Sequence, residues 1–110
     1  MIIENKNILG MKTTIEEMDD RIVVTLQGEM DTAAAVEVEG KLKPYYTEQN
    51  KDVLLDCTGL EYIASSGLRI LLSILKGAKA CGHKVIMRNV NDDIKNVFKL
   101  TGFINIFTFE

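Results

Sequence analysis

The feature that most constrains the fold is an abrupt change of pattern in the middle of the chain. Val53-Leu54-Leu55 is a continuously apolar run, typical of a strand that is buried on both faces of a sheet. Residues 68–80 then place apolar side chains at spacings of three and four, which predicts a helix. The residues between them are predicted to form a loop that enters this helix at Ser65 and Ser66.

A hydroxyl at a helix entry lies among backbone N–H groups that have no partner within the helix. Those donors and the helix dipole stabilise an anion placed there. Ser65 and Ser66 therefore mark a position suited to a phosphate, either bound or covalently attached. Serines at helix starts are more often simple caps, and position alone favours that interpretation.

Strands and helices alternate along the rest of the chain. Strands are predicted at residues 13–18, 21–27, 51–56 and 84–88, with a last strand or extended tail at 104–109. Helices are predicted after Asp31 or Thr32, over residues 66–80, and after Asn91. The first two strands form a hairpin, so the order is β-β-α-β-α-β-α-β. This order predicts one small α/β domain with a mixed, mostly parallel sheet of about four to five strands and three main helices.

Two local features are harder to place. Pro44 is expected to end or kink the first helix near residues 40–43, because its ring and missing N–H disrupt the preceding turn. Residues 1–10 form an N-terminal extension of uncertain role, as an extra edge strand or a packed arm, ahead of a domain over residues 11–110. Met11 is an alternative start.

Composition excludes several classes of function. The chain has 110 residues, a net charge of −3 and a pI of about 5.2, which argues against nucleic acid as a partner. No apolar run approaches the roughly 20 residues that cross a bilayer, and the N-terminus does not resemble a secretory signal. We therefore expect a cytoplasmic protein without membrane insertion.

Cys57 and Cys81 are expected to be reduced and largely buried, and a chain with a single histidine is not expected to hold a metal site. No cofactor is expected.

Signatures of catalysis are weak. The stretch around Ser65 does not match Gly-x-Ser-x-Gly, and His83 is predicted at the opposite end of the helix that Ser65 begins. Asp31 and Asp56 follow successive strands and could meet at one sheet edge for acid-base or metal chemistry. Their simpler interpretation is a helix cap and a local hydrogen-bond acceptor. The chain is therefore expected not to be an enzyme.

Three ordered motifs resemble the anti-sigma factor antagonists, which are built on the STAS domain. The first is the turn Gly28-Glu29-Met30-Asp31 after a β-branched strand. The second is the strand, loop and helix entry from Val53 to Leu68, with its Ser65-Ser66-Gly67-Leu68 ending. The third is the end of the last helix, Val97 to Phe103. Together they cover about residues 11–109.

The resemblance implies a binding protein regulated by a phosphorylation cycle. Members of the family bind an anti-sigma factor that is also a serine kinase, and thereby release a sigma factor for transcription. The kinase phosphorylates the first serine of the motif, here Ser65, and a serine phosphatase restores the free hydroxyl. The resemblance and the helix pattern place the partner surface at Asp31, Ser66, Gly67, Arg69, Ile70 and Ile74. An exposed Ile70 or Ile74 would supply its apolar contact. The simpler interpretation of this apolar strip is core in a helix that packs on two sides.

The sequence departs from the family pattern at one position. Ala64 stands immediately before Ser65, where the best-known members have an aspartate. Some STAS domains work without a phosphorylation cycle, so the alternative function is a constitutive scaffold or binding subunit of a signalling or lipid-transport complex. An enzyme that uses Asp31, Asp56 and Ser65 ranks below both.

Overall fold

The computed structural model describes residues 2–6 and 11–110, and for residues 2–6 it describes the backbone alone. Six strands form one sheet in the order β1-β2-β3-β4-β5-β6, so spatial order follows chain order. The strands are β1 (Ile2–Lys6), β2 (Met11–Glu17), β3 (Arg21–Met30), β4 (Asp52–Ile63), β5 (Val85–Arg88) and β6 (Thr108–Phe109). The helices are α1 (Thr32–Thr47), α2 (Ser65–Ala80) and α3 (Asp92–Leu100). The predicted α/β class and the predicted order of elements from residue 11 onwards are confirmed.

The sheet is mixed. β1 pairs antiparallel with β2, and β2 pairs antiparallel with β3, whereas all pairs from β3 to β6 are parallel. Of the two arrangements considered for the first ten residues, the structure has the edge strand, which is β1. This strand raises the sheet from the expected four to five strands to six. The boundary between residues 10 and 11 falls beside residues 7–10, which lie outside the described part of the chain.

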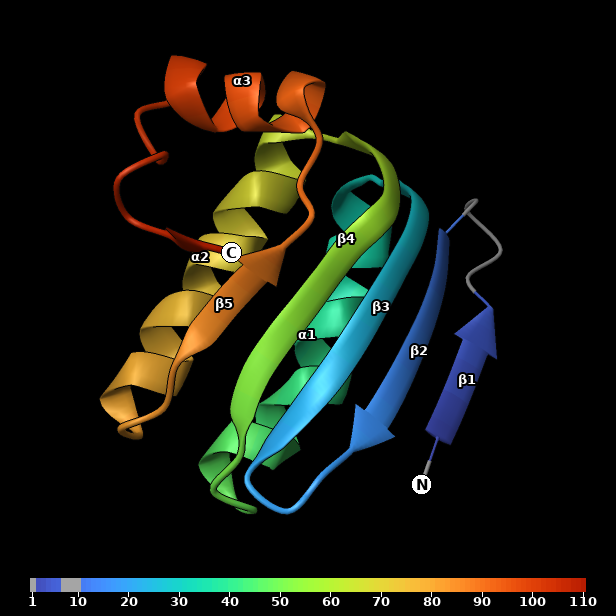
Figure 1. The fold of residues 1–110 in the computed structure, drawn as a ribbon, viewed down its shortest axis with the longest axis vertical. Coiled ribbons are helices and arrows are strands. Elements are labelled where there is room, and N and C mark those ends of the chain that lie inside the picture. The colour runs from blue at the N-terminus through green and yellow to red at the C-terminus, as the bar shows by residue number, and fades with distance from the viewer. Residues whose placement is uncertain (1, 7–10) are drawn as a thin grey trace.

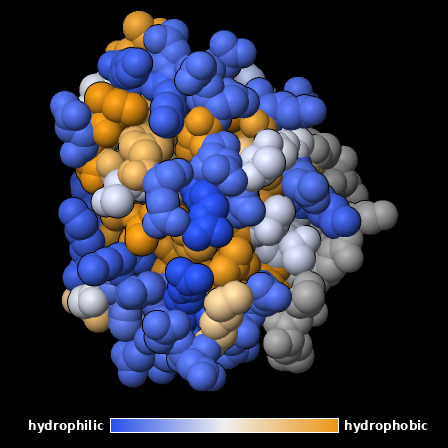
Figure 2. Space-filling view, viewed as in Figure 1, coloured by the Kyte–Doolittle hydropathy of each residue, from blue (hydrophilic) through white to orange (hydrophobic). Residues whose placement is uncertain are grey.

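Helices α1 and α2 lie side by side against one face of the sheet, and α3 lies across the end at which β4 stops (Figure 1). The core lies between these layers and is built from alternate strand residues and from one side of each helix. On the opposite face, which no helix covers, hydrophilic side chains surround hydrophobic patches at the centre and at the upper left of the view (Figure 2). The expectation that the helices cover one face more than the other is therefore confirmed.

Strand β4 is longer than predicted. Residues 57–63 were expected to form a loop, but they continue the strand and pair with β3 as far as Met30 and Ile63. Two register shifts interrupt the ladder, opposite Thr25–Gln27 and Gly28–Glu29 of β3, and each places one extra residue on β4. Cys57, Leu60 and Ile63 are buried at a spacing of three, which differs from the alternation of a regular strand. This spacing hid the strand from the sequence pattern.

Helix α1 does not end before Pro44, as the sequence led us to expect; it continues through Pro44 to Thr47. The missing N–H leaves the carbonyl of Gly40 without its helical donor, and Gly40 is exposed and so available to water. Tyr45 and Tyr46 are buried just beyond the proline. Their burial stabilises the last turn and outweighs the local cost of Pro44.

The C-terminal segment also differs from expectation. The strand predicted over residues 104–109 is reduced to the two residues of β6, because residues 104–106 form a turn and Phe107 lies in a bend. Phe98 of α3 is fully buried and packs edge-to-face against Phe107 and Phe109, at ring distances of 5.2 and 5.3 Å. These aromatic contacts hold the segment against the sheet.

No helix in the described part of the chain is both long and apolar enough to span a bilayer.

Candidate functional site

The predicted serine pair lies where β4 passes into α2. Only Ala64 separates the last strand residue, Ile63, from the first helical residue, Ser65. The Ala64 N–H donates to the carbonyl of Met30 at 2.9 Å, so the end of β3 fixes this junction. Ala64 is the N-cap and has an extended backbone, and no side chain caps the helix. The interpretation of Ser65 or Ser66 as a cap is therefore wrong, because both lie inside the first turn.

The two serines differ in their contacts. The Ser66 hydroxyl is hydrogen-bonded to the Thr32 hydroxyl in the first turn of α1, which joins the N-termini of the two helices. The Ser65 side chain is exposed, and within residues 11–110 its hydroxyl has no hydrogen-bond partner. Ser65 therefore has the exposed, unbonded hydroxyl of the pair, and it lies beside backbone N–H groups of an uncapped helix.

Close packing of the backbone holds this end of α2 in place. Gly67 is buried, and a Cβ atom at this position would lie 3.1 Å from the carbonyl oxygen of Met30 and 3.5 Å from that of Asp31. Only a glycine allows this approach without a shift of the backbone. Gly67 therefore has a structural role in joining α2 to the end of β3. The side of α2 on which it lies is buried and does not face a partner.

Asp31 lies at the same junction and caps α1. Its Oδ1 accepts a hydrogen bond of 2.8 Å from the Ala34 N–H, which confirms the predicted helix cap. Asp56 accepts from the backbone N–H and the hydroxyl of Thr58, at 3.1 and 2.6 Å. Each carboxylate is engaged locally, as the simpler interpretation expected. Residues 11–110 contain no cluster of three or more side chains that could hold a metal ion.

The predicted apolar contact is corrected at one position. Ile74 was one candidate for this contact, but it is fully buried because α2 packs against both α1 and the sheet, as the simpler interpretation of the strip expected. Ile70 is half-buried at the edge of the core, and Arg69 beside it is exposed. Among the positions predicted for partner contact, Asp31, Ser66, Arg69 and Ile70 remain accessible, whereas Gly67 and Ile74 are buried.

Two exposed apolar side chains near this junction were missed. Val36 is 53% exposed and lies one turn after Thr32 on α1, and Tyr62 is 51% exposed at the end of β4. A spacing of four from Thr32 is a signal that could have identified Val36. Tyr62 lies in the stretch interpreted as a loop, so its exposure on a strand could not be predicted.

The two cysteines and the histidine do not form part of the site at Ser65. Cys57 is buried, and burial, with the neighbouring Asp56 charge, raises the pKa of its thiol to about 12. Cys81 follows α2 and is exposed, so the expectation that both thiols are buried is wrong for Cys81. His83 also follows α2, at the end opposite Ser65, and its Nδ1 lies 3.0 Å from Asp52 Oδ1.

Comparison with known proteins identifies the family. The STAS domain model matches residues 12–110. The chain belongs to the STAS domain family. BtrV of Bordetella bronchiseptica, a candidate anti-sigma factor antagonist, is 30% identical over 97 residues, covering 88% of this chain and 84% of BtrV. The anti-sigma-B factor antagonist of Listeria monocytogenes is 24% identical over 99 residues, covering 89% and 87% of the two chains.

Solved structures of the STAS fold agree with this one. The unphosphorylated form of the anti-sigma factor antagonist SpoIIAA has a TM-score of 0.72 at 18% identity and covers 89% of this chain and 86% of its own. The phosphorylated form of SpoIIAA from Bacillus has a TM-score of 0.71 at 19% identity, with coverage of 89% and 90%. At this identity the likeness establishes the fold. The predicted resemblance to STAS-domain proteins is confirmed by the family model.

Proposed function

We propose that this protein is an anti-sigma factor antagonist that binds an anti-sigma factor with serine kinase activity and is switched off by phosphorylation of Ser65. The observation that carries the proposal is the contrast within the serine pair. The Ser65 hydroxyl is exposed and unbonded within residues 11–110, whereas Ser66 is bonded to Thr32. Relatives that are anti-sigma-B factor antagonists support the same role.

The electrostatics of α2 favour a phosphate on Ser65. Phosphorylation adds roughly 1.5 to 2 negative charges at pH 7. Ser65 is the first residue of α2, where N–H groups and the positive end of the dipole meet the added charge, and no acidic residue stands in the first turn. The fold is therefore expected to persist after phosphorylation, as it does in phosphorylated SpoIIAA.

The surface around Ser65 is suited to a protein partner. Val36 on α1 and Ile70 on α2 lie one turn beyond Thr32 and Ser66, the two residues that join the helices. Arg69 adds a positive charge beside Ile70. A phosphate at the edge of this surface places charge and bulk against the docked partner. A loss of about 3 kcal/mol lowers the affinity roughly a hundredfold, which is sufficient for a switch.

The proposed activity is binding and not catalysis. Asp31 and Asp56 are engaged in local hydrogen bonds, and His83 lies at the far end of α2 from Ser65. No side chain among residues 11–110 is hydrogen-bonded to the Ser65 hydroxyl as a general base would be. A serine phosphatase would return the protein to its binding form, and both proposed partners are cytoplasmic enzymes acting on the same hydroxyl.

Mass spectrometry after incubation with the partner kinase and ATP tests the proposal. We expect one phosphate, on Ser65, which Ser65→Ala abolishes. Ser66→Ala is the matched control, because it removes the neighbouring hydroxyl and its bond to Thr32 while leaving Ser65 in place. Phosphate on Ser66, or the same phosphate content in wild type and Ser65→Ala, would contradict the assignment.

A constitutive STAS scaffold is the second candidate, and Ala64 is the observation that favours it. Without the aspartate of the best-known members, the residue before Ser65 offers no carboxylate to a kinase. Affinity capture from the native host distinguishes the two functions. A small ATP-binding kinase among the captured proteins supports the switch, whereas a transporter subunit or a large assembly supports the scaffold.

A further inference from the structure

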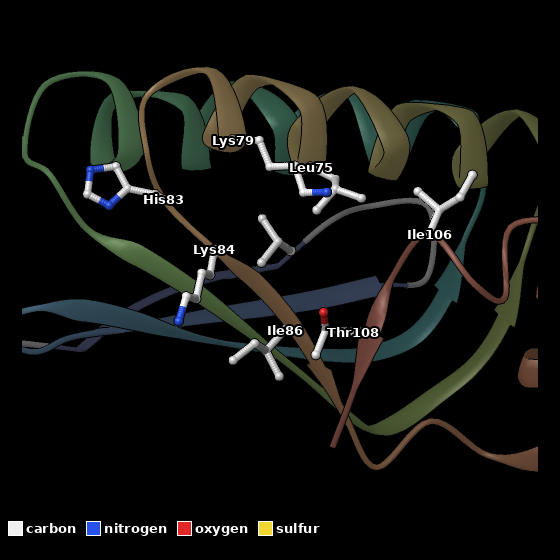
Figure 3. Close-up of a pocket in the computed structure, with 8 residues that line it drawn as sticks. Leu75, Lys79, His83, Lys84, Ile86, Ile106 and Thr108 are labelled. Atoms are coloured by element: carbon white, nitrogen blue, oxygen red, sulfur yellow. The ribbon is translucent and has the colours of Figure 1, made fainter.

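A cavity of about 330 Å³ lies toward the other end of α2, between that helix and strands β5 and β6. Its walls are mainly apolar and include Leu75, Val85, Ile86 and Ile106. Figure 3 shows Leu75 and Lys79 extending from α2 toward the strands, with Ile106 approaching from the C-terminal segment. The site lies several helical turns from Ser65 and shares no residue with the proposed partner surface.

The shortness of β6 explains why the cavity is open. Its two residues pair only with Ile86 and Met87 of β5. The preceding residues 104–107 form a turn and a bend and do not continue the ladder along Val85. Phe107 is buried in the core, whereas Ile106 stays 43% exposed at the wall of the cavity. Apolar side chains thus remain around a volume that a longer strand would have filled.

The charges around the cavity have one sign. None of the residues that line it is acidic, and three are basic: Lys79, His83 and Lys84. His83 is paired with Asp52, and the Lys84 ammonium is turned away from α2 (Figure 3). The Lys79 ammonium is turned toward the cavity and, within residues 11–110, forms no ion pair. Lys79 is therefore the cation available to a bound anion.

The end of α2 does not oppose an anion strongly. The backbone N–H groups of Cys81 and His83 donate to the carbonyl of Ala78, and that of Gly82 donates to Lys79. These bonds satisfy two of the last four carbonyls, those of Ala78 and Lys79, which weakens the negative end of the helix dipole. Thr108 adds a hydroxyl among the lining residues.

We propose that this cavity binds a small amphiphilic carboxylic acid. Its apolar chain would pack between Leu75, Val85 and Ile106, and its carboxylate would pair with Lys79. The volume lies at the lower end of the roughly 300–1,000 Å³ of known ligand sites, which favours a compact chain. An apolar pocket with one or two polar groups that fix the orientation is the usual arrangement of such sites.

A titration of the full-length, isotope-labelled protein with octanoate, below its micelle concentration, tests the proposal by NMR. We expect saturable shifts of the amides of Leu75, Val85 and Thr108. Octanol, which lacks the charge, should bind about fivefold more weakly. Lys79→Gln should lower the affinity for octanoate by a similar factor and leave that for octanol unchanged. Lys76→Gln, an exposed lysine on the same helix outside the cavity, is the matched control.

A second pair of variants keeps the proposal testable if Lys79→Gln perturbs the helix. Ile106→Asp places a carboxylate at the half-exposed wall and should bind octanoate more weakly than Ile106→Asn. The absence of saturable shifts, equal affinities for octanoate and octanol, or shifts centred on Val36 and Tyr62 would overturn the proposal. Ser65→Ala should bind octanoate as the wild type does, so this outcome is independent of the proposed switch.

Discussion

The two ends of α2 differ in how their backbone groups are satisfied. At the N-terminal end, Ala64 provides no side-chain cap, and the Ser65 hydroxyl is exposed without a bond in residues 11–110. At the C-terminal end, the backbone N–H groups of Cys81 and His83 donate to the carbonyl of Ala78, and that of Gly82 donates to the carbonyl of Lys79. The N-terminal end therefore has backbone donors left over for added negative charge, whereas at the C-terminal end two of the last four carbonyls have donors. This asymmetry makes Ser65 suitable for a phosphate.

The largest expected effect comes from breaking the packing that positions the N-terminal end of α2. Gly67→Ala should lower the free energy of unfolding by about 1–3 kcal/mol, because its Cβ would lie 3.1 Å from the Met30 carbonyl oxygen, a backbone atom that cannot move freely. Urea unfolding followed by circular dichroism measures this loss.

Gly40→Ala is the matched control for that substitution. Gly40 lies within α1, is exposed, and has nothing within 4 Å of an added Cβ. The higher helix propensity of alanine should raise the free energy of unfolding by up to about 1 kcal/mol. Destabilisation of similar size in both variants would mean that the approach of α2 to β3 is not what makes Gly67 necessary.

Completing the N-terminal end should stabilise the protein. Ala64 has φ −74° and ψ 153°, the extended conformation of an N-cap, so Ala64→Asp can accept a hydrogen bond from the first turn. We expect the free energy of unfolding to rise by about 1 kcal/mol. Ala64→Leu, which cannot cap, is the control in the same thermal melt. No gain for aspartate over leucine would show that this end already has its partners.

The smallest effect concerns the acid sensitivity of the fold at the C-terminal end of α2, where Asp52 contacts His83. Partial burial acts to raise the pKa of Asp52, but hydrogen bonds from the Lys84 N–H and from His83 outweigh it and lower the pKa. A lowered pKa stabilises the fold above the ordinary titration range of the carboxyl, and this contribution is lost as the pH falls through the lowered value. The Asp52 side chain is 44% exposed, so the contribution should stay below about 1 kcal/mol.

The wild type should therefore be more stable than Asp52→Asn at neutral pH, and this difference in the free energy of unfolding should shrink as the pH falls into strong acid. Denaturant midpoints measured across this range give the comparison. Asp20→Asn is the control, because the exposed Asp20 side chain has no hydrogen bond or ion pair within residues 11–110. A constant difference between Asp52→Asn and wild type at every pH would contradict the assignment.

The sequence predicted the elements whose local pattern and tertiary packing agree. The helix cap at Asn91 is confirmed by a 2.8 Å hydrogen bond from the Ile94 N–H. The apolar run at residues 53–55 lies in the middle of the sheet, and the hairpin of β2 and β3 forms as expected. These features depend on neighbours in sequence, which a single chain reveals.

Predictions failed where contacts distant in sequence decide the outcome. The passage of α1 through Pro44 depends on the burial of Tyr45 and Tyr46, and the extension of β4 depends on pairing with β3 in which β4 carries two extra residues. Ile74 is buried because α1 packs beside α2. At the site, the motif identified Ser65, but only the structure distinguishes its free hydroxyl from that of Ser66, which bonds to a residue 34 positions away.

The most direct test of the central claim is the affinity of this protein for its anti-sigma factor, measured by calorimetry before and after phosphorylation of Ser65. Phosphorylation should weaken binding by roughly a hundredfold or more while the thermal melt of the protein alone is unchanged or higher. Equal affinities for the two forms, or weaker binding accompanied by unfolding, would contradict a switch based on an exposed hydroxyl at a helix end that tolerates charge.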